Sequence, residues 1–234
     1  MMERETTTWP KTASWPPASP LPDGESLRQR LLEVLLPSTA PRKMTYEEFL
    51  AWADEDTLAE WVNGEVAMYS PAPDRHQDIV RFLTAVLSVF VETRDLGVIR
   101  PAPFQIRLGP DLPGREPDLL FVGADHLERL KETYLDGPAD LTVEIASPES
   151  MGRDRGDKFY EYARAGVPEY WLIDPEMEWA EFYQLEKGRY RVAFSGKEGR
   201  YEARVLPGFW LRVEWLWREP LPKVLEVLRE LGLI

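Results

Sequence analysis

The sequence contains no cysteine among its 234 residues. This absence excludes disulfide frameworks, thiol nucleophiles and thiolate metal sites. The side chains left for binding a metal are the carboxylates and the two histidines, His76 and His126. Any metal ion bound here is therefore expected to be a hard one that prefers oxygen ligands.

The sequence also has no long apolar run. No segment approaches the roughly 20 consecutive apolar residues that a membrane-spanning helix needs. The N-terminal residues 1–22 are polar and proline-rich, without the apolar centre of a secretion signal. A glycine-rich phosphate loop is missing as well, which argues against a nucleotide triphosphatase. We therefore predict a cytoplasmic protein with no membrane partner.

Basic residues are outnumbered by acidic ones, 28 to 41, which gives a formal charge of −13. That balance disfavours nucleic-acid binding, which depends on lysine and arginine contacts to phosphates. Its distribution is uneven, since residues 44–69 hold seven acids and no basic residue, whereas residues 153–158 are locally positive. A nuclease should gather a positive groove and a binding module should not; the candidate groove residues are Arg100, Arg107, Arg115, Arg153 and Arg155.

Length and proline content suggest how the chain is organised. A chain of this size that is 44% hydrophobic can bury one substantial core. Residues 1–25 are predicted to be a proline-rich extended arm, because proline lacks a donor and restricts its predecessor. Residues 26–40 are predicted to form a short amphipathic helix and linker, followed by the main domain at 41–219 and a C-terminal helix at 220–234. The short helix is a candidate for docking on the core or on another subunit, and a homodimer could form through the arm and this helix.

The pattern of the main domain predicts an α/β (α+β) fold, with a central mixed sheet, helices on its faces and an attached β-meander. Thr45 to Glu48 has the form of a capping box, and Asn63-Gly64 is a typical hairpin turn. Helices are expected at 76–93, 155–165 and 224–231, and strands at 98–108, 118–122, 141–145 and 170–173. The strand, helix, strand order over 141–173 predicts a parallel pair. The meander is expected at 179–185, 189–194 and 201–206.

Glu144 is the most informative residue, because it lies inside the apolar strand Leu141 to Ile145. A central strand is covered on both faces, and a carboxylate there needs a cation or a shifted pKa. The alternative is a solvated glutamate on an edge strand. Asp118 follows Pro117 at a strand start, which is also ordinary turn chemistry. Lys158, with Asp154 and Tyr162 four residues to either side, is by itself typical of a surface lysine.

Several motifs in order resemble the Uma family of restriction endonucleases, within the PD-(D/E)XK nuclease superfamily. The resemblance covers about residues 44–217 and rests on the following segments: Glu60 to Glu65, Pro71 to His76, Pro117-Asp118, Val143 to Pro148, Lys158, Tyr162, and Gly166 to Trp171. It implies a restriction-endonuclease-like core.

The resemblance also implies roles for individual residues. Asp118 and Glu144 would bind Mg²⁺, with Mn²⁺ as an alternative, and the carbonyl of Ile145 would be a further ligand. Glu60 would be an additional metal-binding carboxylate on the helix side; on its own, it is typical of a solvated acidic face.

Lys158 would assist the attacking water. One departure from the family pattern is Ala146, which stands where the usual lysine follows the strand glutamate, so the resemblance implies that Lys158 replaces it. His76 falls where a histidine is common in the family and is a minor candidate for contacting a phosphate or orienting a carboxylate; a lone histidine at a helix start is more often a surface residue.

Three functions stay open at this point. The first is hydrolysis of DNA phosphodiester bonds by a magnesium-dependent endonuclease with Glu60, Asp118, Glu144 and Lys158 as its catalytic residues. The second is a catalytically silent binding or assembly module with a nuclease fold, which the charge and the displaced lysine favour. The third is a hydrolase of a smaller phosphate ester, which would tolerate an acidic surface.

Overall fold

The computed structural model describes residues 43–53, 59–62, 64–68, 73–147 and 150–234. The predicted arm at 1–25 and helix at 26–40 lie outside the described residues. Residues 42–234 form one compact unit. None of the helices in the described ranges is long and apolar enough to cross a bilayer.

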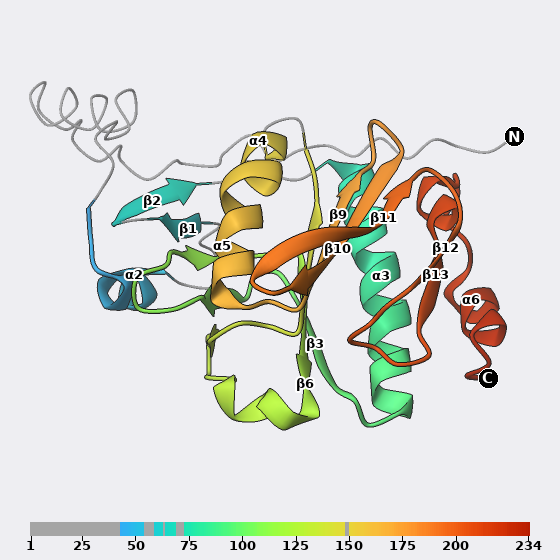
Figure 1. Cartoon of the computed structure of the whole chain (residues 1–234), viewed down its shortest axis with the longest axis horizontal. Helices are drawn as coiled ribbons and strands as arrows, with labels where there is room; N and C mark the ends of the chain where they lie inside the picture. Colours follow the sequence, from blue (N-terminus) through green and yellow to red (C-terminus); the bar gives the residue numbers. More distant parts are fainter. Residues whose placement is uncertain (1–42, 54–58, 63, 69–72, 148–149) are drawn as a thin grey trace, which may run out of the picture. The chain divides into compact units, whose positions relative to one another are not determined.

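The central element is a six-stranded mixed sheet with the strand order β11-β10-β9-β8-β6-β3 (Figure 1). Its strands, in chain order, are β3 (Gly97–Pro101), β6 (Leu119–Gly123), β8 (Leu141–Ile145), β9 (Glu169–Asp174), β10 (Trp179–Glu186) and β11 (Arg189–Gly196). β8 and β9 pair in parallel, as predicted, and the other neighbours are antiparallel. β8 lies between β6 and β9, so the edge-strand interpretation of Glu144 is wrong.

A second sheet of five strands, in the order β2-β1-β5-β4-β7, lies beside it and was not predicted. Its strands are β1 (Ala59–Val62), β2 (Glu65–Met68), β4 (Gln105–Arg107), β5 (Gly114–Arg115) and β7 (Tyr134–Asp136). β1 and β2 form the predicted hairpin. The predicted strand 98–108 is divided between the two sheets, because β3 belongs to the six-stranded sheet and β4 to the second sheet.

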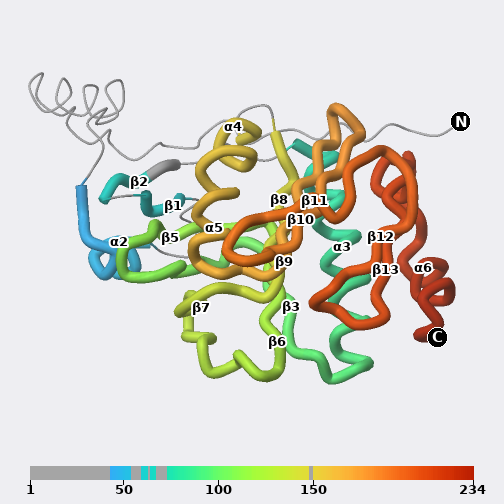
Figure 2. Tube along the Cα trace, viewed as in Figure 1, coloured from blue at the N-terminus to red at the C-terminus, as the bar shows by residue number. Residues whose placement is uncertain are grey.

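The two faces of the six-stranded sheet are covered by different elements, which can be followed in the trace of Figure 2. α3 (Asp74–Thr93) packs on one face together with η3 (Val213–Trp217) and α6 (Val224–Glu230). α5 (Phe159–Ala165) and parts of the second sheet pack on the other face. α3 buries the predicted stripe of Ile79, Phe82, Leu83, Val86, Leu87 and Phe90.

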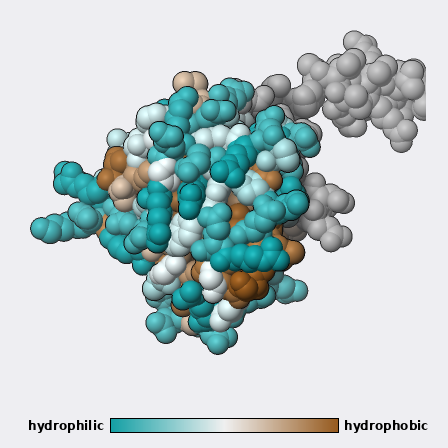
Figure 3. Space-filling view, turned by 90° about the vertical axis from the view of Figure 1, so that its right-hand side faces the viewer, coloured by the Kyte–Doolittle hydropathy of each residue, from teal (hydrophilic) through white to brown (hydrophobic). Residues whose placement is uncertain are grey.

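The predicted meander is only half right. β10 and β11 form its hairpin, but β12 (Arg200–Glu202) pairs with β13 (Trp210–Arg212) in a separate two-stranded sheet. The buried carboxylate of Glu169 holds this sheet against β9, because it accepts bonds from Tyr201 and from the backbone of Arg204 at 2.7 and 2.8 Å. The face that carries β12, β13 and α6 is mostly hydrophilic, with hydrophobic side chains gathered most densely at the lower right of the view (Figure 3).

Local sequence signals explain the helix ends. α2 (Tyr46–Trp52) begins with the predicted capping box between Thr45 and Glu48. The helix after β8 starts earlier than predicted, as α4 (Met151–Arg153), and continues through η2 (Asp154–Lys158), a π-helical turn, into α5. It ends at Gly166, whose φ of 89° is left-handed, a conformation that glycine adopts without strain.

Candidate active site

Glu144 is buried in β8 and has two hydrogen-bond partners. Its side chain accepts a bond from Lys158 Nζ at 2.9 Å and one from the Tyr162 hydroxyl at 2.7 Å. Burial raises the pKa of Glu144 well above its ordinary value, although the Lys158 charge opposes the shift. The structure therefore places a carboxylate where holding a negative charge requires a neighbouring cation.

Lys158 supplies that cation and is itself surrounded by acids. Its ammonium lies 2.9 Å from Glu144, 3.2 Å from Glu60 and 3.4 Å from Asp154, and its side chain is only 5% exposed. Asp154 and Lys158 are four residues apart and share one face, as predicted. The π-helical turn and its predecessor α4 thus direct both residues at the strand ends instead of at solvent.

Glu60 lies in β1 of the second sheet and is 0% exposed. The alternative of a solvated acidic face is therefore wrong for this residue. One of its oxygens accepts from Arg115 at 2.9 Å, and the other accepts from the backbone N–H of Glu116 at 3.0 Å. Glu60 reaches Lys158 because the two sheets meet at the site.

Arg115 is a residue of this site that the sequence reasoning assigned to a surface groove. It is 1% exposed and binds Glu161 of α5 through two hydrogen bonds of 2.7 and 3.0 Å, besides its bond to Glu60. Arg107 and Arg155, two other proposed groove residues, are paired with Glu47 and Glu181, each at 3.1 Å. The prediction that Arg115 lines a groove is wrong, because it joins β5 to β1 and α5 inside the protein.

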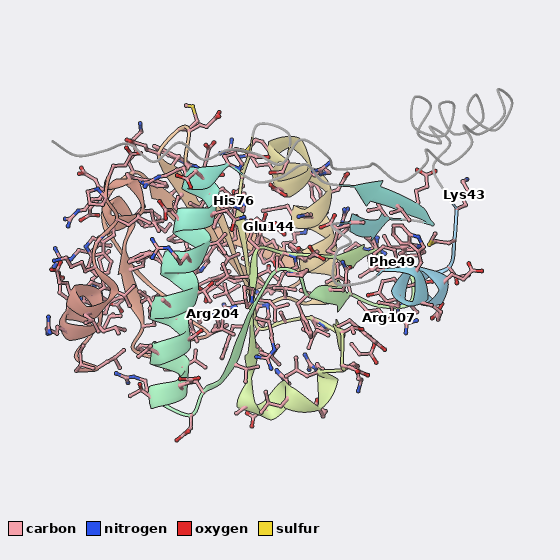
Figure 4. All side chains as sticks on the ribbon, turned by 180° about the vertical axis from the view of Figure 1, so that it is seen from behind. Lys43, Phe49, His76, Arg107, Glu144 and Arg204 are labelled. Atoms are coloured by element: carbon pink, nitrogen blue, oxygen red, sulfur yellow. The ribbon has the colours of Figure 1, made fainter. Side chains whose placement is uncertain are left out.

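Asp118 lies just before β6 and touches both a strand and a helix. Its side chain accepts from the backbone N–H of Ile145 at 2.6 Å and lies 3.1 Å from His76 Nε2. His76 is in the first turn of α3, and Figure 4 shows its label on the same side of the molecule as that of Glu144. Burial acts to lower the pKa of His76, but the hydrogen bond and charge of Asp118 raise it above the ordinary value.

Glu116 is a further carboxylate of the site that the sequence reasoning did not single out. Burial, opposed by the hydrogen bond from Gln105 and reinforced by the charge of Glu60, raises the pKa of Glu116 to about 7. Gln105 Nε2 donates to it at 2.7 Å. Its position directly before Pro117-Asp118 is the only signal in the sequence that associates it with the site.

The acids of the cluster outnumber its cations. The cluster has two basic side chains, Lys158 and Arg115, and six carboxylates: Glu60, Glu116, Asp118, Glu144, Asp154 and Glu161. A hard divalent ion fits this set in charge and in donor type. In geometry, no three acidic or histidine side chains of the described residues converge on one point where they could hold a metal ion.

The predicted site residues are therefore brought together in two adjoining groups. Glu60, Glu144 and Lys158 form one group through direct contacts. Asp118 and His76 form the other, which is joined to the first through the backbone of Ile145. Roles in binding a metal or in catalysis stay predictions for all five.

Comparisons with known proteins agree on the kind of fold. The profile of the Uma2 family, described as "Putative restriction endonuclease", matches residues 46–214. A solved structure of similar fold is described as a putative nuclease belonging to DUF820 from Anabaena variabilis. It has a TM-score of 0.64 and 17% sequence identity, and the match covers 74% of this chain and 97% of that one. No curated protein matches the sequence. The predicted restriction-endonuclease-like fold is thereby confirmed.

Proposed function

This chain belongs to the Uma2 family, which is described as "Putative restriction endonuclease", and from that premise we propose that it is a metal-dependent endonuclease that hydrolyses DNA phosphodiester bonds. The observation that carries the proposal is the buried ammonium of Lys158, which lies within 3.4 Å of three carboxylates. Such a cluster costs folding free energy, and perturbed titratable groups of this kind gather at functional sites.

Asp118 and Glu144, together with the Ile145 carbonyl, are the groups that would hold Mg²⁺ or Mn²⁺, and Glu60 is the next nearest candidate. The ion would supply a Lewis acid for the phosphoryl oxygen and a positive charge that the acidic chain lacks. β6 pairs with β8, so Asp118, directly before β6, and Glu144, in β8, come from neighbouring strands. Their separation is thus set by the sheet and not by a loop.

The other residues of the site act on these groups. Tyr162 donates to Glu144 and fixes the orientation of its carboxylate. His76 does the same for Asp118. Lys158 stabilises negative charge that develops on the phosphoryl group, and its Nζ donates a hydrogen bond that orients the attacking water.

Calorimetric titration of Mg²⁺ and Mn²⁺, followed by plasmid cleavage, tests the proposal. The full chain, Asp118→Asn and Glu144→Gln should be compared with Asp78→Asn, a matched control on the exposed side of α3 whose carboxylate side chain is 45% exposed. We expect binding and cleavage in the full chain and the control, and neither in the two site variants. Cleavage that survives Glu144→Gln contradicts the proposed site.

A binding or assembly module is the second candidate, and one observation favours it. Both oxygens of Glu144 and both oxygens of Asp118 already have partners within the chain. These two candidate ligand carboxylates are thus satisfied by residues of the chain itself. Absence of metal binding in the titration, with the protein folded, supports this candidate over the enzyme.

We also propose that the enzyme works as a homodimer, because cutting two strands takes two sites; this is an argument by analogy. Light scattering on the full chain over a range of concentrations tests it. A monomer mass at every concentration contradicts it.

A further inference from the structure

The end of the β10–β11 hairpin gathers basic side chains that the site does not use. Lys187, Arg189 and Arg191, together with Glu186, line an open hollow of about 400 Å³. Arg204, from the segment after β12, is held beside them because its guanidinium donates to the carbonyls of Pro168 and Leu185 at 3.0 and 3.2 Å. We call Lys187, Arg189, Arg191 and Arg204 the basic hairpin surface.

Its charge runs against that of the whole chain. Residues 187–212 contain seven basic residues and two acids, a local charge of +5 in a chain of −13. Other exposed arginines find acids, as Arg200 does with Glu202 and Arg212 with Glu230. Within the described residues, none of the four side chains of the basic hairpin surface forms an ion pair with an acid. Where acids are in excess, four neighbouring unpaired cations suggest an external anion.

Protection of a sheet edge explains only part of this arrangement. β11 is the edge strand of the six-stranded sheet, and charged residues on such strands prevent pairing with another chain. Arg204 does not belong to that strand, however, and its position is fixed by two backbone carbonyls. A guanidinium has five N–H donors, so those two bonds leave others directed outward.

We propose that the basic hairpin surface binds successive phosphates of a nucleic-acid backbone, without reading its sequence. This inference rests on the proposed function, because it assigns a place to substrate DNA away from the cleaved bond. The strand register pairs Arg191 of β11 with Gln184, Gln184 with Glu169, and Glu169 with Leu141 of β8. Arg191 therefore lies three strands from β8, at the level of Leu141, which is three residues before Glu144. From the spacings of strands and residues in a sheet, the backbones of Arg191 and Glu144 are about 17 Å apart, which is the length of about five base pairs.

The surface lies beside the carboxylate site and not inside it. Arg189 and Arg191 alternate along β11 with Tyr190, which is buried on the α5 side with the Glu144 face. The two arginines therefore leave the sheet on the opposite face, so a duplex that contacts them runs across the β11 edge. Phosphate contacts of this kind position a protein on DNA and contribute salt-dependent affinity.

Fluorescence anisotropy of a labelled duplex, with the full chain and with divalent ions removed by chelation, tests the proposal. The variant carries Lys187→Gln, Arg189→Gln and Arg191→Gln. Loss of three phosphate contacts should reduce the slope of log affinity against log salt by about 2.7 and weaken binding at least about tenfold at 0.1 M salt. Circular dichroism checks that the variant is folded.

A matched control removes the same charge elsewhere through Arg81→Gln, Lys223→Gln and Arg229→Gln, all at exposed positions. We expect the control to keep the slope of the unmodified chain. Equal slopes for the hairpin variant and the control overturn the proposal, as does a chain that binds polyglutamate but no DNA at that surface. Because no metal is present, DNA binding with the expected slope change supports the surface even if cleavage is never found. Cleavage with an unchanged slope overturns the surface and leaves the proposed function standing.

Discussion

Replacing Arg115 by methionine removes the cation that joins three elements of the site. Arg115 makes three hydrogen bonds, of 2.7, 2.9 and 3.0 Å, to Glu161 and Glu60. Methionine keeps an unbranched side chain but offers no donor. Glu60 is 0% exposed. Of its partners described above, it then keeps the Lys158 ammonium and the backbone N–H of Glu116.

The size of the effect follows from burial. Breaking a buried ion pair by removing one partner costs about 3–5 kcal/mol, because a buried charge loses its compensation. Glu161 is 16% exposed and regains water, and Glu60 keeps two partners, so the lower end applies. We expect the free energy of unfolding to fall by about 3 kcal/mol and the Tm by about 10 °C. Arg115→Lys, which keeps the charge but cannot bridge both acids, should lose about half as much.

Urea unfolding followed by tryptophan fluorescence measures the effect. The control is Arg81→Met, because Arg81 pairs with Asp78 at 3.0 Å but both side chains are exposed, at 67% and 45%. That exposed pair should contribute less than about 1 kcal/mol. A loss below about 1 kcal/mol for Arg115→Met, equal to the control, refutes the view that buried Glu60 depends on Arg115.

Three further variants test the site. In the folded protein the pKa of Glu116 is about 7, against an ordinary value of 4.5. The folded state therefore binds this proton more tightly than the unfolded state does. The resulting contribution to stability is fully present below pH 4.5 and is lost as pH rises through 7. Glu116→Gln should remove about 2–3 kcal/mol of this pH dependence, measured by urea unfolding at pH 5 and pH 8; parallel pH profiles refute it. Tyr162→Phe removes the 2.7 Å bond to Glu144 and should cost about 1.5–3 kcal/mol in the same assay; no change refutes the bond. His76→Gln breaks the contact with Asp118 and should weaken calorimetric metal binding about 10-fold; unchanged affinity excludes a positioning role.

Local patterns predicted the parts of the fold that local forces determine. The stripe on α3 and the capping box before α2 depend on residues three or four positions apart, and both formed as expected. The parallel pairing of β8 and β9 follows from the strand, helix, strand order. Glu144 stood out because it is a carboxylate inside an apolar strand, and only the long-range pairing of β8 with β6 and β9 excludes the alternative of an edge strand.

The second sheet could not be predicted because long-range contacts create it. β5 has two residues and pairs with β1 only through Trp61 and Gly114, 53 positions apart. No periodicity can appear in so short a strand. The burial of Glu60 and Arg115 depends on this pairing, so the sequence favoured a solvated acid and a surface arginine.

The displacement of the lysine explains much of the remaining site. Ala146, two residues after Glu144, is 4% exposed and its N–H donates to Ile173 at 2.7 Å. A lysine there would have to displace packed side chains of the core cluster that contains Ala146. The ammonium instead comes from the π-helical turn, where Asp154 accompanies it on the same face. That position adds a buried acid to Glu60 and Glu144, and the excess of negative charge makes a second cation favourable. Arg115 supplies it from the second sheet, so the moved lysine and the buried arginine are two parts of one electrostatic arrangement.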